Sequence, residues 1–95
     1  MISVKYDSLD KNSNEYLKII FGEMLKGKLE QLIPADEIGK WAYDYYFTNM
    51  DILDDEFSDL LQTLSLMDSG PEFEYTYDQL NKVADDLMAG KNVKI

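Results

Sequence analysis

The side chains of this sequence that could do chemistry are mostly carboxylates, and they gather in one stretch. From Trp41 to Asp78 the chain has no Lys, Arg or His, although Asp and Glu recur throughout this range. Aromatic residues lie between these acids. Aromatic side chains supply much of the core of a protein interface, and charge of one sign steers a partner of the opposite sign. The stretch therefore predicts a recognition surface for a basic protein.

The predicted partner-binding residues are the acids of this stretch and three of its tyrosines. They are Asp44, Asp51, Asp54, Asp55, Glu56, Asp59, Asp68, Glu72, Glu74, Tyr43, Tyr75 and Tyr77. The cluster from Asp51 to Asp59 is the densest part, and its carboxylates could pair with Lys and Arg or imitate phosphates. A simpler interpretation is a helix amino terminus, where acids cap the backbone and oppose the helix dipole. Capping explains two or three of these acids, but it does not explain Asp59 or the absence of nearby lysines.

Two other uses of clustered acids fit the sequence poorly. A calcium-binding EF-hand loop needs a central glycine, which the Asp51–Asp59 run lacks. A pair of carboxylates can act as a general acid and base, but nothing here sets such a pair apart. The absence of Cys and His removes thiol nucleophiles, His-dependent triads and the commonest transition-metal ligands. We therefore expect no enzymatic activity, no metal and no cofactor.

The distribution of charge along the chain limits the classes of partner that the protein could bind. The formal net charge is -10, and residues 1–30 contribute nothing to it because their five lysines balance five acids. Phosphate binding depends on clustered Lys and Arg, so nucleic acid and anionic membrane are poor partners. The amino terminus lacks the apolar run of a signal peptide, and no segment is long and apolar enough to span a membrane. We expect a cytoplasmic protein that is monomeric when free.

Length and hydrophobic periodicity predict the fold. With 95 residues, 45% of them hydrophobic, the chain should form one domain over residues 1–95. After a short extended segment within Met1–Lys11, a capping box at Asn12 and Glu15 opens a first helix that ends near Gly27 or continues to Ile33 after a kink. Its apolar stripe is Leu17, Ile20, Phe21 and Met24. Pro34 is expected in the first turn of a second helix.

Two more helices complete the predicted domain. Acids at Asp51, Asp54 and Asp55 cap a third helix, which buries Phe57, Leu60, Leu61 and Leu64 and ends near Asp68. Thr76 and Gln79 form a second capping box before a helix that buries Leu80, Val83, Ala84 and Leu87 and stops at Gly90. The expected fold class is all-α, a small four-helix bundle.

The second helix carries two apolar stripes on roughly opposite sides. One is Ile38, Trp41, Ala42 and Tyr45, and the other is Tyr43, Tyr46, Phe47 and Met50. Either this helix is the central element of the bundle or one stripe is exposed as a docking surface, and the central position is favoured. We assign Trp41, Tyr45, Tyr46 and Phe47 to the core. Tyr43, Tyr75 and Tyr77 are expected to be exposed interface anchors.

The sequence also resembles a family. Gly27-Lys28, Pro34-Ala35-Asp36-Glu37-Ile38 and Trp41-Ala42, followed by Asp54-Asp55-Glu56-Phe57, Leu60-Leu61, Leu64, Asp68, Tyr75 and Asp78, are similar to the pattern of small acidic bacterial proteins. Such proteins recur as immunity proteins of polymorphic toxin and contact-dependent growth inhibition systems. The resemblance covers about Leu25 to Leu87. It implies a protein that binds and neutralises a basic toxin domain, often a nuclease.

One closer similarity does not hold. Asp44-Tyr45-Tyr46 resembles the Tyr-Tyr motif by which colicin DNase immunity proteins grip their nucleases, but in those proteins a Pro follows the pair in a short third helix. Here the pair lies inside the long second helix, and Phe47 follows it. The role of that motif is therefore not transferred.

Two further hypotheses share the same acidity. The chain could be a nucleic-acid mimic that inhibits a DNA-binding defence protein, which would be recognised by competition with DNA. It could also be a small adaptor that associates with itself through an exposed aromatic stripe, in which case its mass in solution would depend on concentration.

Overall fold

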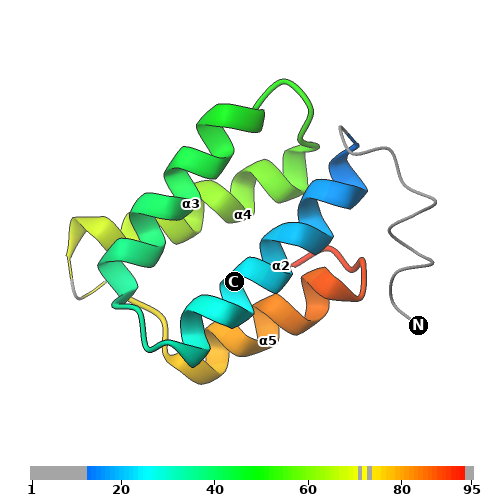
Figure 1. Ribbon diagram of the computed structural model, residues 1–95. Helices are drawn as coiled ribbons and strands as arrows, with labels where there is room; N and C mark the ends of the chain where they lie inside the picture. Colours follow the sequence, from blue (N-terminus) through cyan, green and yellow to red (C-terminus); the bar gives the residue numbers. More distant parts are fainter. Residues whose placement is uncertain (1–12, 71, 73, 94–95) are drawn as a thin grey trace.

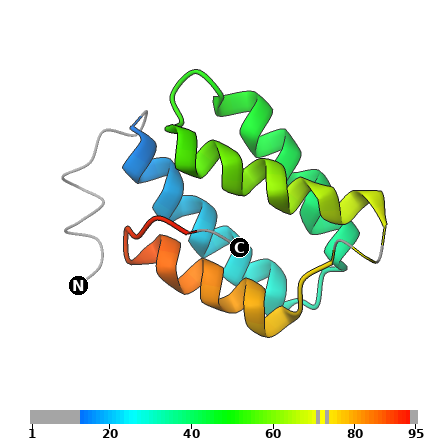
Figure 2. The same ribbon diagram turned by 180° about the vertical axis from the view of Figure 1, so that it is seen from behind.

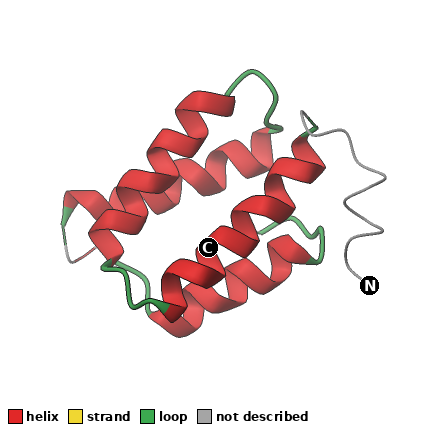
Figure 3. Cartoon of the chain, viewed as in Figure 1, coloured by secondary structure: helices red, strands yellow, loops and turns green. Residues whose placement is uncertain are grey.

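The fold is an all-α bundle of four helices, as the sequence predicted. A computed structural model describes residues 13–70, 72 and 74–93, and helices make up most of this part of the chain (Figure 3). The helices are α2 (Asn14–Glu30), α3 (Ala35–Asn49), α4 (Asp55–Ser65) and α5 (Tyr77–Met88), and a short 3-10 helix η1 (Leu66–Ser69) follows α4 directly. The extended segment expected within Met1–Lys11 lies outside the described residues.

Successive helices run in opposite directions (Figure 1). The first and last helices, α2 and α5, lie side by side, and the middle pair, α3 and α4, form the other half of the bundle (Figures 1 and 2). Short connections force this up-and-down order, because antiparallel neighbours need only a few linking residues. None of the described helices has both the length and the apolar character needed to cross a membrane.

Capping residues set where the helices begin. The side chain of Asp54 accepts a hydrogen bond of 2.8 Å from the Phe57 backbone N–H, as expected of a cap. The box between Thr76 and Gln79 is complete, which confirms that prediction. The first helix differs, because Ser13 and not Asn12 caps it, accepting from the Tyr16 N–H. Pro34 also lies one position outside the expected place, at the cap rather than in the first turn.

Of the two ends predicted for the first helix, the structure favours the later one. The helix continues through Gly27 to Glu30. Beyond it, the N–H of Leu32 donates to the carbonyl of Leu29 and the N–H of Ile33 donates to the carbonyl of Lys28. These two bonds form a Schellman motif, which needs a left-handed residue, here Leu32 with φ of 58°. At the end of α5, the same motif uses Gly90, as predicted, with φ of 80°.

Phe21 of α2 lies at the centre of the core and is fully buried. Its ring stacks on Trp41 of α3, with centroids 4.3 Å apart and planes 4° from parallel, and meets Phe57 of α4 edge-on at 5.8 Å. The apolar stripe predicted for α2 is therefore correct at Phe21. It is wrong at Met24, which is 39% exposed, because the buried stripe continues through Leu25 and Leu29 instead.

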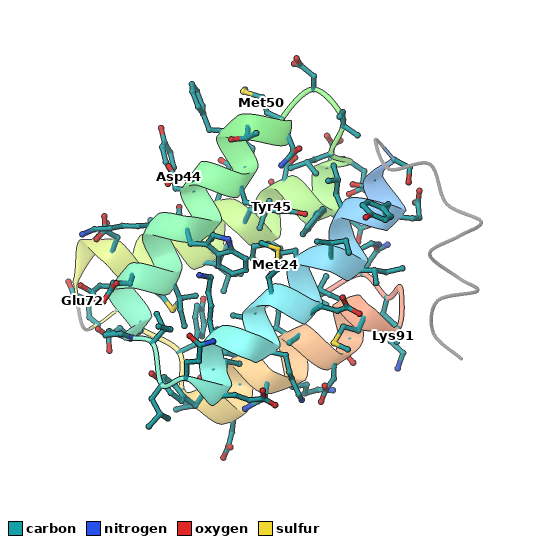
Figure 4. The ribbon with its side chains drawn as sticks, in the orientation of Figure 1. Met24, Asp44, Tyr45, Met50, Glu72 and Lys91 are labelled. Carbon is teal, nitrogen blue, oxygen red and sulfur yellow. The ribbon has the colours of Figure 1, made fainter. Side chains whose placement is uncertain are left out.

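Tyr45 ties α3 to α2 from the same cluster. Its side chain points from α3 towards α2 (Figure 4), and its hydroxyl donates a 2.8 Å hydrogen bond to the carbonyl of Leu17. Burial, and secondarily the nearby Tyr16, raises the pKa of Tyr45 to about 12. Together with Trp41, this residue turns one side of α3 inward and so fixes which side faces out.

Two glycines permit the close approach of the helices. A Cβ at Gly22 would lie 2.8 Å from the carbonyl oxygen of Ala84 in α5, and one at Gly39 would lie 2.8 Å from the backbone nitrogen of Asp68. Backbone atoms cannot move aside as a flexible side chain can. Both positions therefore need glycine for packing, although both lie inside helices.

The two glycines of α2 give a matched test of this packing. Gly22→Ala should destabilise the fold by about 1–3 kcal/mol, because α2 would have to move away from α5. Gly27→Ala should stabilise it by about 0.5–1 kcal/mol, since a Cβ there meets nothing within 4 Å and alanine favours the helix. Urea unfolding of both variants measures the difference. Equal effects of the two substitutions would contradict the packing described here.

The raised pKa of Tyr45 predicts a pH dependence. An unfolded tyrosine ionises near pH 10, so between about pH 10 and pH 12 the unfolded chain loses a proton that the folded protein retains. The free energy of unfolding should fall with rising pH across this window, and the fall should be smaller in Tyr45→Phe. Chemical unfolding from about pH 9 to about pH 12, compared between the two proteins, isolates the contribution of Tyr45 because the rest of the chain is the same in both. Parallel curves would contradict the assignment.

Candidate docking face on α3 and α4

The outer side of α3 carries a row of apolar side chains exposed to solvent. Tyr43, Phe47 and Met50, spaced four and three residues apart, form this outer stripe and are 53%, 63% and 46% exposed. The rings of Tyr43 and Phe47 are nearly parallel, at 6° and 6.2 Å between centroids. Met50 and the neighbouring Asp44 project away from the bundle in Figure 4.

This exposure corrects two predictions. The second helix is not the central element of the bundle, and Phe47 is not a core residue. The physical reason is that α3 packs its Trp41 and Tyr45 side against α2 and its Gly39 side against α4 and η1. No element of the described chain covers its remaining side. The docking-surface alternative for the second stripe therefore matches the structure.

Two shallow hollows lie between this stripe and α4 with η1, and they share Tyr43, Ser65 and Leu66. The first, the Asp68 hollow, has a volume of about 460 Å³ and is also lined by Gly39, Lys40, Asp44, Asp68 and Ser69. The second, the Asp59 hollow, has a volume of about 610 Å³ and is also lined by Tyr46, Asp59, Gln62 and Thr63. With the outer stripe they make one continuous surface, called here the α3–α4 face.

The charge of this face is predominantly negative. Asp44, Asp59 and Asp68 line the hollows, and among the described residues Lys40 is the one lysine that does so. Its Nζ lies 3.9 Å from Asp68 Oδ1, and both side chains are largely exposed, so this ion pair is loose and weak. Of the predicted partner-binding residues, the structure thus brings Tyr43, Asp44, Asp59 and Asp68 together.

The acids at the start of α4 form a separate group. Asp51, Asp54, Asp55 and Glu56 are all exposed and line neither hollow. Asp54 caps the helix and also accepts a 2.9 Å hydrogen bond from the Asn14 side chain, which joins the α3–α4 connection to the start of α2. Among the residues that the structure describes, no three acidic side chains are close enough together to hold a metal ion.

Glu56 belongs to a polar network at the edge of the core. Lys18 of α2 is 4% exposed, and its Nζ donates to the side-chain oxygen of Asn92 at 2.8 Å. The amide of Asn92 in turn donates to Glu56 at 3.0 Å. An ammonium buried in this way needs hydrogen-bond partners and nearby negative charge. Glu56 therefore has a structural role in addition to any contact with a partner.

The last predicted group lies in the connection before α5 and at the first residue of that helix. Glu72 and Glu74 are exposed, but Tyr75 and Tyr77 are only half-exposed and pack against the core. The hydroxyl of Tyr77 donates a hydrogen bond to the carbonyl of Ile33, in the connection between α2 and α3. Tyr75 and Tyr77 are therefore not the freely exposed anchors that the sequence suggested, because both side chains pack against the core.

Four aromatic or large apolar residues of the face were missing from the predicted partner-binding set. They are Tyr46, Phe47, Met50 and Leu66. The first three lie on the second apolar stripe of α3, which a central position of this helix would have buried. Leu66 lies two positions after Leu64, off the buried spacing of Phe57, Leu60, Leu61 and Leu64, and it is 45% exposed at the start of η1.

Exposure of the outer stripe predicts how substitutions affect stability. Phe47→Ser should change the free energy of unfolding by no more than about 0.5 kcal/mol, because the ring packs mainly against another exposed side chain. Phe21→Ala should cost about 3–5 kcal/mol, since it opens a cavity between three helices. Urea unfolding measures both values. A cost above about 2 kcal/mol for Phe47→Ser would mean that the ring is packed in solution and would remove it from the face.

Comparison with known proteins adds no family to this description. No family model matches the chain, and neither the curated proteins nor the solved structures contain a match.

Proposed function

We propose that this protein is an immunity protein of the cytoplasm, which binds a basic bacterial toxin domain through its α3–α4 face and neutralises it. The observation that carries the proposal is the outer stripe of Tyr43, Phe47 and Met50, exposed beside carboxylates. No segment of the described chain covers this stripe.

The apolar part of the face suits a protein partner. Contiguous exposed apolar side chains, bordered by polar ones, are typical of interaction sites. Tyr and Phe lose little conformational entropy on binding, and here the two rings already support one another at 6.2 Å. The two rings are thus already ordered in the free protein, so less conformational entropy is lost when the partner binds.

The charge of the face suits a basic partner. Asp44, Asp59 and Asp68 lie on it, the acids of the α4 amino terminus add to the field from beside it, and Lys40 is the one lysine lining it. Such a field accelerates association with a cationic surface and repels an anionic one. Nucleic acid and anionic membrane are therefore disfavoured at this face.

A toxin that cleaves nucleic acid meets these requirements. Its substrate groove must be rich in Lys and Arg in order to hold phosphates. A small acidic protein seated on that groove would exclude the substrate. The resemblance of residues 25–87 to bacterial immunity proteins supports the same choice.

The proposal is tested by capture followed by neutralisation. A tagged copy expressed in the source cell should retain one basic protein at about 50 mM salt and most of it at about 300 mM, because apolar contacts persist when charges are screened. Expression of that protein alone should stop growth. Co-expression of the present protein should restore growth.

Variants connect this result to the face. Phe47→Ser and Tyr43→Ser should each weaken binding by about 2 kcal/mol or more, which is roughly thirtyfold in Kd. The combined change of Asp44, Asp59 and Asp68 to Asn should mainly slow association and flatten its salt dependence. Leu32→Ser is the matched control, since Leu32 is 72% exposed but lines neither hollow, and it should leave binding unchanged.

Two results would contradict the proposal. Capture of several DNA-binding proteins, all lost at the higher salt and displaced by DNA, would favour the nucleic-acid mimic. Recovery of the chain itself, with a sedimenting mass that rises with concentration, would favour a self-associating adaptor.

A further inference from the structure

The Asp59 hollow has the groups that recognise a guanidinium. It is lined by the phenol rings of Tyr43 and Tyr46, the carboxylate of Asp59 and the polar side chains of Gln62 and Thr63. The hollow is open to solvent, and Tyr43 is 53% exposed, so a side chain from outside can reach these groups. Tyr46 packs partly against the core, so its position at one side of the hollow is fixed. The other residues named here are not among the core side chains that hold α3 to α4.

Among the residues that the structure describes, no cation pairs with the carboxylate in this hollow. The ion pairs of the described residues join Lys26 to Asp85, Lys40 to Asp68 and Lys82 to Asp86, and none involves Asp59. No lysine lines the Asp59 hollow. Asp59 is therefore available to a cation from another molecule, and its exposure means that this cation need not displace a buried contact.

The neighbouring Asp68 hollow has a similar set of lining groups, and there a lysine of the chain already lies near the carboxylate. It shares Tyr43, Ser65 and Leu66 with the Asp59 hollow and likewise offers a carboxylate. There the chain supplies Lys40, whose Nζ lies 3.9 Å from Asp68. The α3–α4 face therefore already holds one cation beside Tyr43, and the Asp59 hollow is the corresponding place on the other side of the shared residues.

Arginine fits the Asp59 hollow better than lysine does. A guanidinium is planar, so it can stack on a tyrosine ring while its N–H groups donate to a carboxylate and to side-chain oxygens. An ammonium gains the charge but lacks a flat surface to stack. It is also more strongly hydrated, so it loses more when it leaves water. Phosphates and carboxylates would be repelled by Asp59.

We propose that the Asp59 hollow is an arginine site, in which an arginine side chain of the protein partner stacks on a tyrosine ring and pairs with Asp59. This inference rests on the proposed function, because the arginine belongs to the basic protein that docks on the α3–α4 face. It adds the chemistry of recognition: one arginine of the partner is an anchor, and a lysine at the same place would bind more weakly.

The test uses the free protein and a small probe. Protein labelled with ¹⁵N is titrated with N-acetyl-arginine amide and, separately, with N-acetyl-lysine amide, and backbone amide signals are followed by NMR. Arginine amide should shift the signals of Gln62, Thr63, Ser65 and Leu66 in a saturable way. Lysine amide should bind about threefold to tenfold more weakly, because it lacks the stacking contribution.

Three variants locate the binding. Asp59→Asn and Tyr43→Ala should each weaken arginine binding by about threefold to tenfold. Both residues are exposed, so these variants should remain folded, and the dispersion of the same spectra verifies this. Asp78→Asn makes the same charge change at an exposed position of α5, outside both hollows, and should leave the affinity unchanged.

The inference is overturned if arginine and lysine amides bind equally, if Asp59→Asn has no effect, or if the shifts spread over all the acidic residues. Any of these results would leave the proposed function standing, since capture and neutralisation test it separately. Conversely, saturable arginine binding in this hollow together with failure to capture a toxin would support the site and refute the immunity function.

Discussion

The contact on which the rest of the structure depends is the packing of Phe21 between three helices. Its ring meets Trp41 and Tyr45 of α3 and Phe57 of α4, so the first helix is joined to both members of the middle pair at one buried point. Aromatic rings bury a large area and prefer particular geometries, so this cluster fixes the rotation of α3 about its axis as well as its position. With the Trp41 side turned inward and Gly39 pressed against η1, Tyr43 and Phe47 can only face outward. The exposed aromatic stripe is thus a consequence of how the core is built.

The described acidic residues fall into two groups, those that have a structural partner within the bundle and those that have none. Asp54 caps α4, Glu56 accepts a hydrogen bond from Asn92 beside the buried Lys18, and Asp85 and Asp86 pair with lysines. Surface pairs of this kind contribute little stability, and a net charge of -10 repels itself in the compact state. Asp44 and Asp59 have no such structural partner among the described residues. They oppose folding slightly, and in the proposed complex they gain a cation, so their energetic benefit lies in association.

Local chemistry in the sequence predicted much of the fold. The apolar spacing of Phe57, Leu60, Leu61 and Leu64, the Thr76–Gln79 capping box and the Gly90 stop are all confirmed, because each depends on residues close together in the chain. The sequence predicted two possible ends for α2, since the residue that closes the helix, Leu32, adopts a left-handed conformation that is more typical of glycine. The central position that the sequence favoured for α3 was wrong. Two apolar stripes look alike in one sequence, and only contacts with Phe21 from another helix decide between them. Tyr77 was misplaced for the same reason, since its partner, the Ile33 carbonyl, is distant in sequence.

The two hollows beside Tyr43 indicate how a surface with so much negative charge can still be selective. Charge alone attracts any basic protein, and it acts mainly on the rate of association. Selectivity requires groups that leave some partners unsatisfied. In the Asp68 hollow the chain's own Lys40 already meets the carboxylate, so a partner cation gains less there. In the Asp59 hollow the carboxylate lies with two tyrosine rings and no lysine, so a flat cation gains both pairing and stacking. A partner with an arginine at this one position would dissociate slowly. A basic protein without that arginine would associate equally fast but dissociate sooner.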